Sequence, residues 1–559
     1  MLLKIIIILS FLLYQTNLYS KSTETNEFNQ KYLSNYLSAL ISYDNQNNDK
    51  ASEFFNSSKF LIKKHDNFLK KYVFSLVLDG QVKKAIDQIK FSKNAQNSNF
   101  FEANLLLTLD SFKKKNFKQV SERLKKLEIL KDNGTYEFVI YKTLESYNNL
   151  YLYKKIEKQS ENFGNLSLIT SAFQNCYLNS KKTSSHFVNL INSNEDDYSR
   201  YLFFYFSNLI QNNEFDTAIE ISKTIQPLTV SLLISQSKKW IDEKQYNKFS
   251  DYFSCKNEND ILSEFFFLIS NLFSSQEMFE ESNFYLSISE YLNSKFYFNL
   301  SLLVENYYFN NNLDLAIKTL ENFNKKDEIY DWYKTTKIGK IISEKENDET
   351  SLNYIEKKFK LIKNPSIREL YDLANIYKKF NKYQKAIDYY SKVLLEVDKN
   401  SLVYSKILYQ RGSSFERIKN YNKADIDLLN SIKLNPDDAY TLNYLAYSWL
   451  ERNYRIDEAI EMIQKAYNKK ENDPYITDSV GWGYYLIGDY IKAEKYLKKA
   501  IQLMPDDPIV NDHYGDVLWK LNRKLQAKYF WQSVLELEEA EEEMKKNIKS
   551  KLLNGLEKF

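Results

Sequence analysis

Residues that commonly carry catalysis or bind metals are scarce in this chain and lie far apart. Its 559 residues include three histidines, His65, His186 and His513, and two cysteines, Cys176 and Cys255. A zinc peptidase needs two histidines at HExxH spacing, a phosphate-binding loop needs closely spaced glycines, and a serine hydrolase needs a GxSxG turn. The sequence contains none of these motifs, and its cysteines lack the spacing of a metal site. We therefore predict a non-enzymatic protein without a metal or other cofactor.

His513 and the two cysteines each have a structural and a functional interpretation. His513 lies in the segment NDHYGDVLWK, where a polar residue near a helix crossing is the ordinary interpretation and a ligand contact is the alternative. An exported location would permit a disulfide between Cys176 and Cys255. Two cysteines in a large helical protein are more often unpaired, so we expect free thiols.

A pattern repeated five times between Ile367 and Glu541 predicts the helices that position these residues. A small residue is followed twelve places later, once thirteen, by alanine, and four places further on by an apolar or aromatic residue. Gly481, Ala493 and Leu497 show this spacing. Two antiparallel helices approach closely only where small residues stand at their crossing, and a repeat of this length is typical of stacked helical hairpins.

Small and aromatic residues in the first helix, alanine in the second and a closing proline together resemble the tetratricopeptide repeat family. The resemblance is strongest over residues 367–541, where the second-helix alanines are Ala386, Ala424, Ala459, Ala493 and Ala527. The segments DSVGWGYYLIGDY and NDHYGDVLWKLNR also resemble exported bacterial proteins built from this repeat. The resemblance implies an all-α fold, an α-solenoid that is degenerate in its N-terminal two-thirds and regular in its C-terminal third.

Four segments follow from these patterns. We expect a signal peptide or short anchor at residues 1–22, degenerate helical repeats at 23–366, five regular repeats at 367–541 and a capping helix at 542–559. In the degenerate part the position of the second-helix alanine is held by Ala51, Ala85, Val120, Ala218, Ser282 and Ala316. Residues from about 151 to 260 give no clear register, and a separate N-terminal domain is the alternative to one continuous superhelix.

The first residues have the layout of a secretory signal. Lys4 precedes an apolar run from Ile5 to Tyr14, and Ser20 and Ser22 are small residues suited to a cleavage point. The run is shorter than the roughly 20 residues of a membrane span, so an uncleaved anchor is the alternative. Both interpretations place the body of the protein outside the cytoplasm. We expect a periplasmic protein that contacts the membrane only through an uncleaved N-terminal segment.

The resemblance also implies where a partner would bind. In this family the first helices line the concave face, and ligand contacts recur at fixed positions of each first helix. Matching those positions gives a predicted groove of Tyr371, Asn375, Tyr409, Asn443, Tyr447, Asp478, Trp482, Tyr485, Asp512, Asp516 and Trp519. Tyrosine and tryptophan are typical of binding hot spots, although packing between repeats is the ordinary alternative for Trp482 and Trp519.

Charge narrows the class of partner. The chain has 77 basic and 74 acidic residues, and a net charge of +3 gives no support for nucleic-acid binding. The groove positions run from basic in the first two repeats to acidic in the last two, which favours a peptide with oppositely charged ends. We expect an exported scaffold that binds a protein or peptide during assembly or maintenance of a bacterial cell envelope. The alternatives are an envelope glycan-binding factor and a cell-wall hydrolase with an unrecognised site.

Overall fold

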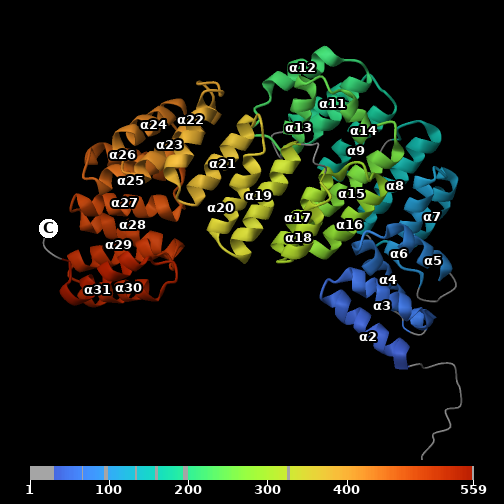
Figure 1. Cartoon of the computed structure of the whole chain (residues 1–559), viewed down its shortest axis with the longest axis horizontal. Helices are drawn as coiled ribbons and strands as arrows, with labels where there is room; N and C mark the ends of the chain where they lie inside the picture. The colour runs from blue at the N-terminus through green and yellow to red at the C-terminus, as the bar shows by residue number, and fades with distance from the viewer. Residues whose placement is uncertain are drawn as a thin grey trace, which may run out of the picture. The chain divides into compact units, whose positions relative to one another are not determined.

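A computed structural model describes residues 30–63, 65, 67–92, 98–132, 135–157, 161–192, 199–323 and 328–556. These ranges contain helices and no strand (Figure 1). The chain forms an N-terminal unit, Met1–Ile225 with Val230–Lys334, and a C-terminal unit, Gln226–Thr229 with Thr335–Phe559. The all-α repeat architecture predicted from the sequence is confirmed. The predicted signal peptide lies outside the described residues, and no helix among those described is long and apolar enough to cross a membrane.

The N-terminal unit is built mainly of helices of 8 to 18 residues. Its α-helices are α2 (Gln30–Asp44), α3 (Asn48–Ser57), α4 (Phe68–Leu78), α5 (Val82–Phe91), α6 (Phe101–Lys113), α7 (Phe117–Leu130), α8 (Tyr136–Tyr153), α9 (Asn165–Tyr177), α10 (Thr183–Ile191), α11 (Tyr201–Gln211), α12 (Phe215–Thr224), α13 (Leu232–Asp242), α14 (Asn247–Tyr252), α15 (Glu258–Ser274), α16 (Phe279–Leu292), α17 (Leu300–Phe309) and α18 (Leu313–Leu320). Two short 3-10 helices are η1 (Lys59–Lys63) and η3 (Tyr297–Asn299).

The C-terminal unit begins within α19 and contains the regular repeats. Its helices are α19 (Glu328–Lys345), α20 (Asp348–Phe359), α21 (Ile367–Lys379), α22 (Tyr383–Leu394), α23 (Leu402–Arg417), α24 (Tyr421–Leu434), α25 (Ala439–Glu451), α26 (Ile456–Lys469), α27 (Pro474–Leu486), α28 (Tyr490–Leu503), α29 (Pro508–Lys520), α30 (Lys524–Glu536) and α31 (Glu542–Asn554). The five predicted repeats are the hairpins α21–α22, α23–α24, α25–α26, α27–α28 and α29–α30.

Small residues at the helix crossings explain why these hairpins close so tightly. The alanines at the five crossings are at most 1% exposed: Ala386, Ala424, Ala459, Ala493 and Ala527. A Cβ added to Gly481 of α27 would lie 2.5 Å from Leu497 Cγ and 3.0 Å from its backbone nitrogen. A Cβ on Gly515 of α29 would lie 2.5 Å from the Trp531 ring. Larger residues at these positions would force the two helices of the hairpin apart.

A sixth hairpin of the same kind, α19–α20, precedes the five predicted repeats. Its crossing is formed by Gly339 and Ser351, and Ser351 Oγ donates a hydrogen bond of 2.7 Å to the Gly339 carbonyl. A Cβ on Gly339 would lie 2.5 Å from the side chain of Ile355. The spacing therefore matches the repeat, with serine in place of the second-helix alanine. This substitution is the reason that the sequence pattern did not extend to residues before Ile367.

Most hairpin turns contain one residue with left-handed backbone geometry, and these residues mark the repeat in both units. They are Gln46, Gly80, Lys115, Asn179, Asn213, Lys244, Glu277, Asn311, Asn381, Lys419, Asn453, Gly488 and Asn522. Asparagine and glycine adopt this conformation more readily than most residues. Between about 151 and 260, where alanine spacing gave no repeat register, the left-handed residues Asn179, Asn213 and Lys244 show where the hairpin turns lie. The 18-residue helix α8 ends at Tyr153, at the start of that region.

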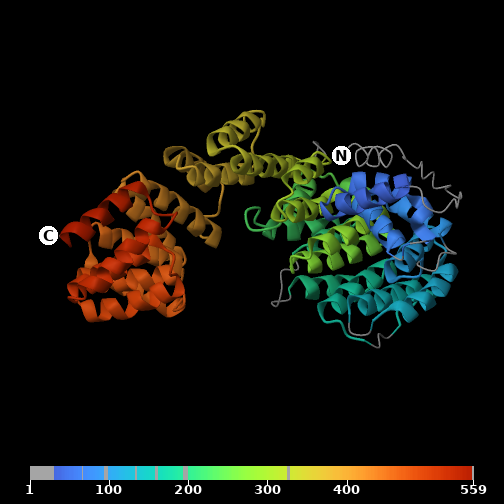
Figure 2. The same cartoon turned by 90° about the horizontal axis from the view of Figure 1, so that it is seen from below.

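The N-terminal unit closes on itself. Phe74 of α4 stacks on Phe284 of α16 with ring centroids 4.6 Å apart. The Lys113 ammonium lies 3.8 Å from the centroid of the Tyr291 ring. Figures 1 and 2 show α4 beside α16, although more than half of this unit separates them in sequence. The concave side of this unit is therefore partly occupied by its own helices, with α6 and α15 in contact.

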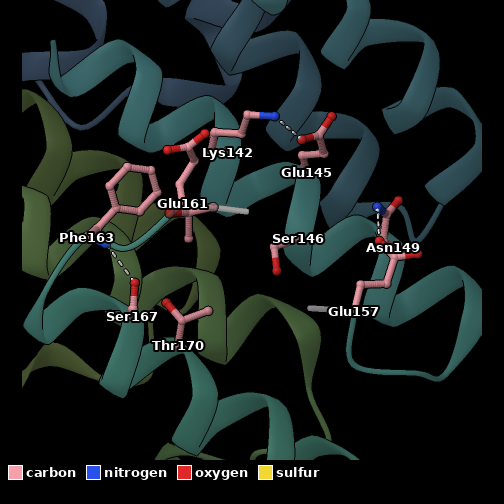
Figure 3. Close-up of a pocket in the computed structure, with 10 residues that line it drawn as sticks. Lys142, Glu145, Ser146, Asn149, Glu157, Glu161, Phe163, Ser167 and Thr170 are labelled. Carbon is pink, nitrogen blue, oxygen red and sulfur yellow. Dashed lines mark hydrogen bonds and ion pairs between the residues drawn. The ribbon is translucent and has the colours of Figure 1, made fainter. Parts of the chain in front are cut away.

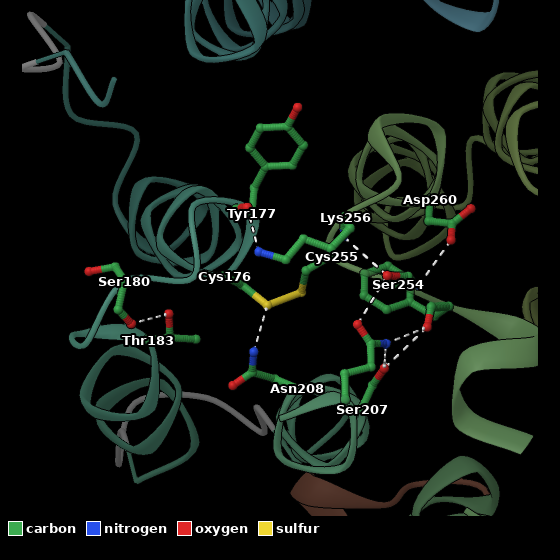
Figure 4. Close-up of a disulfide and its surroundings, with 12 residues drawn as sticks. Cys176, Tyr177, Ser180, Thr183, Ser207, Asn208, Ser254, Cys255, Lys256 and Asp260 are labelled. Atoms are coloured by element: carbon green, nitrogen blue, oxygen red, sulfur yellow. Dashed lines mark hydrogen bonds between the residues drawn. A yellow bond between two sulfur atoms is a disulfide. The ribbon is translucent and has the colours of Figure 1, made fainter. Parts of the chain in front are cut away.

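The cysteines correct the expectation of free thiols. Cys176 at the end of α9 and Cys255 just before α15 form a disulfide, with Cα atoms 5.7 Å apart (Figure 4). Both residues are buried, and Asn208 of α11 lies beside them with its Nδ2 3.4 Å from Cys176 Sγ. The bond joins residues 79 positions apart, with α10 to α14 between them in the sequence. Cysteine spacing gives no signal for such a contact.

Candidate binding groove of the C-terminal unit

A candidate site in the C-terminal unit is a cavity of about 550 Å³ between the first helices of successive repeats. Its walls come from the C-terminal part of α23, from α25 and α27, and from the start of α29. Three predicted groove residues line it, namely Asn443, Tyr447 and Asp478. The volume is within the range of ordinary ligand pockets.

Capping residues at the helix N-termini fix which side chains face this cavity. Asp438, Asp473 and Asp507 are the N-cap residues of α25, α27 and α29. The Asp507 carboxylate accepts hydrogen bonds of 2.9 Å from the backbone N–H groups of Ile509 and Val510. An N-cap carboxylate satisfies backbone donors that the helix leaves unpaired, so it defines where the helix begins. The three aspartates therefore give the three first helices the same starting point and the same register.

Carboxylates in the cavity wall accept hydrogen bonds from neutral aromatic side chains. The Tyr444 hydroxyl donates to Glu416 Oε2 over 2.9 Å, and Trp482 Nε1 donates to Glu451 Oε1 over 2.9 Å. Burial raises the pKa of Tyr447, and the nearby carboxylates of Glu451 and Asp478 raise it further. Tyr447 is therefore a neutral donor at physiological pH. The wall combines aromatic surface with negative charge.

His513 connects the fourth and fifth repeats. Its Nδ1 lies 2.9 Å from Asp478 Oδ2, and its ring stacks on Trp482 with centroids 4.0 Å apart. Trp482 also stacks on Tyr485, with centroids 4.7 Å apart. Burial by itself would lower the pKa of His513, but the carboxylates of Asp478, Asp512 and Asp516 together raise this pKa above its ordinary value. His513 thus acts in packing between repeats, and Trp482 and Tyr485 share in that packing.

The chain's last helix covers the predicted groove positions of the fifth repeat. Lys551 of α31 donates to Asp512 Oδ1 over 2.5 Å and to Asp516 Oδ1 over 2.8 Å. Asp516 also accepts a hydrogen bond of 3.0 Å from Trp531 Nε1. Gly555, the residue after α31, packs against Trp519. A Cβ added to Gly555 would lie 2.1 Å from the Trp519 ring. Asp512, Asp516 and Trp519 are therefore engaged by intramolecular contacts, away from the cavity.

The predicted positions of the first two repeats lie outside the cavity as well. Asn375 Oδ1 accepts a hydrogen bond of 2.7 Å from the Tyr390 hydroxyl, and Tyr371 packs against the same ring. Tyr409 meets Tyr444 edge to face, with centroids 5.7 Å apart. These side chains join the two helices of a repeat or join one repeat to the next.

Lys378 is a partly buried lysine beside Tyr409 that the predicted set omits. Its Nζ donates to Gln410 Oε1 over 2.6 Å and to Ser413 Oγ over 2.5 Å. Burial lowers its pKa to about 8, and the positive charge of Arg417 acts in the same direction. Its position in the first helix of the first repeat is the signal that could have identified it.

A smaller polar pocket of about 110 Å³ lies in the N-terminal unit between α8, α9 and the segment before α9 (Figure 3). Its polar side chains largely satisfy one another, since Lys142 pairs with Glu145 at 2.9 Å and Asn149 donates to Glu157 over 2.8 Å. The sequence did not indicate this pocket because the alanine pattern has no register there. Nowhere in the described residues do three or more His, Cys, Asp or Glu side chains form a group able to hold a metal ion.

Comparisons with known proteins agree with the repeat pattern. Residues 370–395 and 405–438 match the family model for the tetratricopeptide repeat. A tetratricopeptide repeat-containing protein of Pseudomonas aeruginosa is 37% identical over 110 residues, which make up 20% of this chain and 18% of that relative. This chain thus matches less than a fifth of the length of that relative.

Solved structures of such proteins also match parts of the chain. A thermophilic tetratricopeptide repeat protein of Thermus thermophilus is 18% identical with a TM-score of 0.30, over 34% of this chain and 100% of that one. A tetratricopeptide repeat protein of Parabacteroides merdae is 17% identical with a TM-score of 0.38, over 45% of this chain and 97% of that one. The two hairpins α21–α22 and α23–α24 therefore match the tetratricopeptide repeat, and the next three hairpins have the same buried small residues at their crossings.

Proposed function

We propose that this protein is an exported, non-enzymatic scaffold that binds a protein or peptide in the concave groove of its C-terminal unit. Tetratricopeptide repeat proteins generally mediate interactions between proteins. The observation that carries the proposal is the cavity of about 550 Å³ whose walls come from four consecutive repeats. Its lining includes Tyr421, Tyr444, Tyr447 and Tyr475, and tyrosine is enriched at the hot spots of protein interfaces.

The position of the cavity favours an extended partner. Tyr475 and Ile509 line it and are about half exposed, at 57% and 48%. Exposed apolar area next to a cavity provides surface that a partner can bury. In contrast, α31 covers the end of the groove at Asp512 and Asp516. We infer that a partner binds from the second repeat to the start of α29 in the fifth, and does not displace α31.

Export to the periplasm is the second part of the proposal. Its support is the N-terminal sequence, in which Lys4 precedes an apolar run, together with the buried disulfide between Cys176 and Cys255. Disulfides persist in oxidising compartments and are rare where thiols are kept reduced. A role in assembly or maintenance of the cell envelope would follow from this location.

Affinity capture with matched variants tests the binding function. The mature protein, a Tyr447→Ala variant and a Tyr529→Ala variant would be used to capture proteins from envelope extract. Tyr447 lines the cavity, whereas Tyr529 is 68% exposed on α30, a second helix. We expect a partner that wild type and Tyr529→Ala retain and Tyr447→Ala loses. Equal capture by all three proteins would exclude this groove as the binding site.

A reporter fusion tests the location. A fusion of residues 1–30 to a reporter that is active only in the periplasm should be active, and replacing Ile7 and Leu9 by lysine should abolish that activity. Retention of the unaltered fusion in the cytoplasm would contradict export.

A further inference from the structure

The charges around the cavity do not balance. Four carboxylates line it, from Glu416, Glu451, Asp478 and Asp507, against two guanidinium groups, from Arg417 and Arg452. Arg452 is already paired, because its Nη2 donates to Asp425 Oδ1 over 2.8 Å. Arg417 is exposed at the rim. The lining therefore carries an excess of negative charge.

Most of these carboxylates have neutral partners. Glu416 accepts from the Tyr444 hydroxyl, Glu451 from Trp482 Nε1, and Asp507 from two backbone N–H groups. Within the described ranges, no lysine or arginine forms an ion pair with any of these three. Only Asp478 has a partner able to carry positive charge, His513. Negative charge held in place by neutral donors is available to a cation from outside.

The aromatic walls suit the same kind of ligand. Tyr444, Tyr447 and Tyr475 all line the cavity. A guanidinium or ammonium group is attracted both by carboxylates and by the faces of aromatic rings.

We propose that this cavity receives an arginine or lysine side chain from a basic segment of the partner polypeptide. The inference rests on the proposed function and specifies the chemistry that the groove recognises. Glu416 and Glu451 bind the cationic head group, while Tyr447 and Tyr475 pack against the aliphatic stem and the peptide backbone. An anionic peptide would instead bring negative charge to a site that already has an excess of it.

Glutamine substitutions separate charge from structure. The double variant Glu416→Gln/Glu451→Gln removes both negative charges but keeps oxygen acceptors for Tyr444 and Trp482. The control variant is Glu461→Gln, which removes an exposed carboxylate from α26, a second helix. The wild type and both variants would be full-length proteins, and their thermal unfolding would be measured to confirm that they are equally stable.

Dodecapeptides displayed on phage would first be selected on the wild-type protein. We expect the bound peptides to be enriched in arginine or lysine at one position. A synthetic peptide with arginine at that position and its counterpart with neutral citrulline there would then be titrated by fluorescence anisotropy. Citrulline should weaken binding to the wild type and to Glu461→Gln by about tenfold. The same exchange should have little effect on binding to the double variant.

The outcomes distinguish the inference from the proposed function. Peptides that bind the wild type, lose binding on Tyr447→Ala and show no preference for arginine or lysine would overturn the inference alone. An equal effect of citrulline on the wild type and the double variant would do the same. Failure to select any peptide that depends on Tyr447 would overturn both.

Discussion

At the scale of single residues, the contact between Asp478 and His513 shows how one repeat is fixed to the next. Their atoms lie 2.9 Å apart in a buried position, and Trp482 stacks on the imidazole. The Asp512 and Asp516 carboxylates add to the attraction that raises the pKa of His513. The same aspartate lines the cavity, so the packing of the fifth repeat orients a wall of the groove.

This contact predicts a specific dependence of stability on pH. The folded-state pKa of His513 is raised above 6.5, so its contribution is complete below that value and is lost as pH rises through the raised pKa. His513→Gln should therefore lower the free energy of unfolding more at about pH 5.5 than at about pH 9. Urea unfolding followed by tryptophan fluorescence measures both values. A deficit of equal size at both pH values would contradict the ion pair.

Two glycines on α27 give a matched test of the helix crossing. Gly481→Ala places a Cβ against Leu497 and should lower the free energy of unfolding by about 1–3 kcal/mol. At Gly483 the nearest atoms to an added Cβ are 3.4 Å and 3.5 Å away, which is ordinary contact. Gly483→Ala should be neutral or stabilise by up to about 1 kcal/mol, because alanine favours helix. Equal effects of the two substitutions would show that the crossing lies elsewhere.

At the scale of elements, α31 seals the end of the repeat stack through a buried cluster of charges. Lys551 bridges Asp512 and Asp516, and Ile548 is fully buried beneath the helix. Burial, followed by the charge of Asp512, raises the pKa of Asp516 to about 6 even with Lys551 in place. The terminal repeat thus has one buried and one partly buried aspartate, and α31 provides the lysine that pairs with both.

Removal of that lysine should be costly. Lys551→Met leaves two carboxylates close together without their cation, and we expect a loss of at least about 2 kcal/mol in the free energy of unfolding. Lys549→Met is the control, because Lys549 is exposed on the same helix. A melting temperature of Lys551→Met equal to that of Lys549→Met would show that α31 is not held by this cluster.

The elements also show what the sequence could and could not predict. Alanine or glycine at a crossing is a steric requirement, so residues such as Ala493 and Gly515 identified their hairpins correctly. The crossing of α19 and α20 has Ser351 at the alanine position, and the pattern therefore missed it. Groove positions were harder to assign, because Asn443 and Asp512 occupy matching places in their repeats. What distinguishes Asp512 from Asn443 is the contact of Asp512 with Lys551.

At the scale of the whole molecule, the chain combines two units with different concave sides. In the N-terminal unit α6 contacts α15, and the disulfide ties α9 to the segment before α15. In the C-terminal unit the first helices line a cavity of about 550 Å³. Neither the closure of the first unit nor the disulfide could be predicted from the sequence. Both depend on contacts between residues many positions apart, such as Phe74 with Phe284.

The division into units predicts that loss of the disulfide acts locally. The double variant Cys176→Ala/Cys255→Ala removes a link across 79 residues of the N-terminal unit. It should destabilise that unit by about 2–5 kcal/mol, and the C-terminal unit should keep its stability. Hydrogen exchange measured by mass spectrometry resolves the two, with peptides from α11 and α15 losing protection and those from α25 and α27 unchanged. Equal loss in both units would contradict independent stability.

The central claim is that a partner polypeptide binds the groove of the C-terminal unit, and site-specific photocrosslinking in living cells tests it most directly. The photoreactive amino acid p-benzoylphenylalanine would replace Tyr475 at the cavity or, as a control, Tyr529 on α30, since both side chains are exposed. The account predicts a discrete crosslinked product containing another polypeptide from position 475 and none from position 529. Absence of a product from position 475, or the same product from both positions, would contradict it.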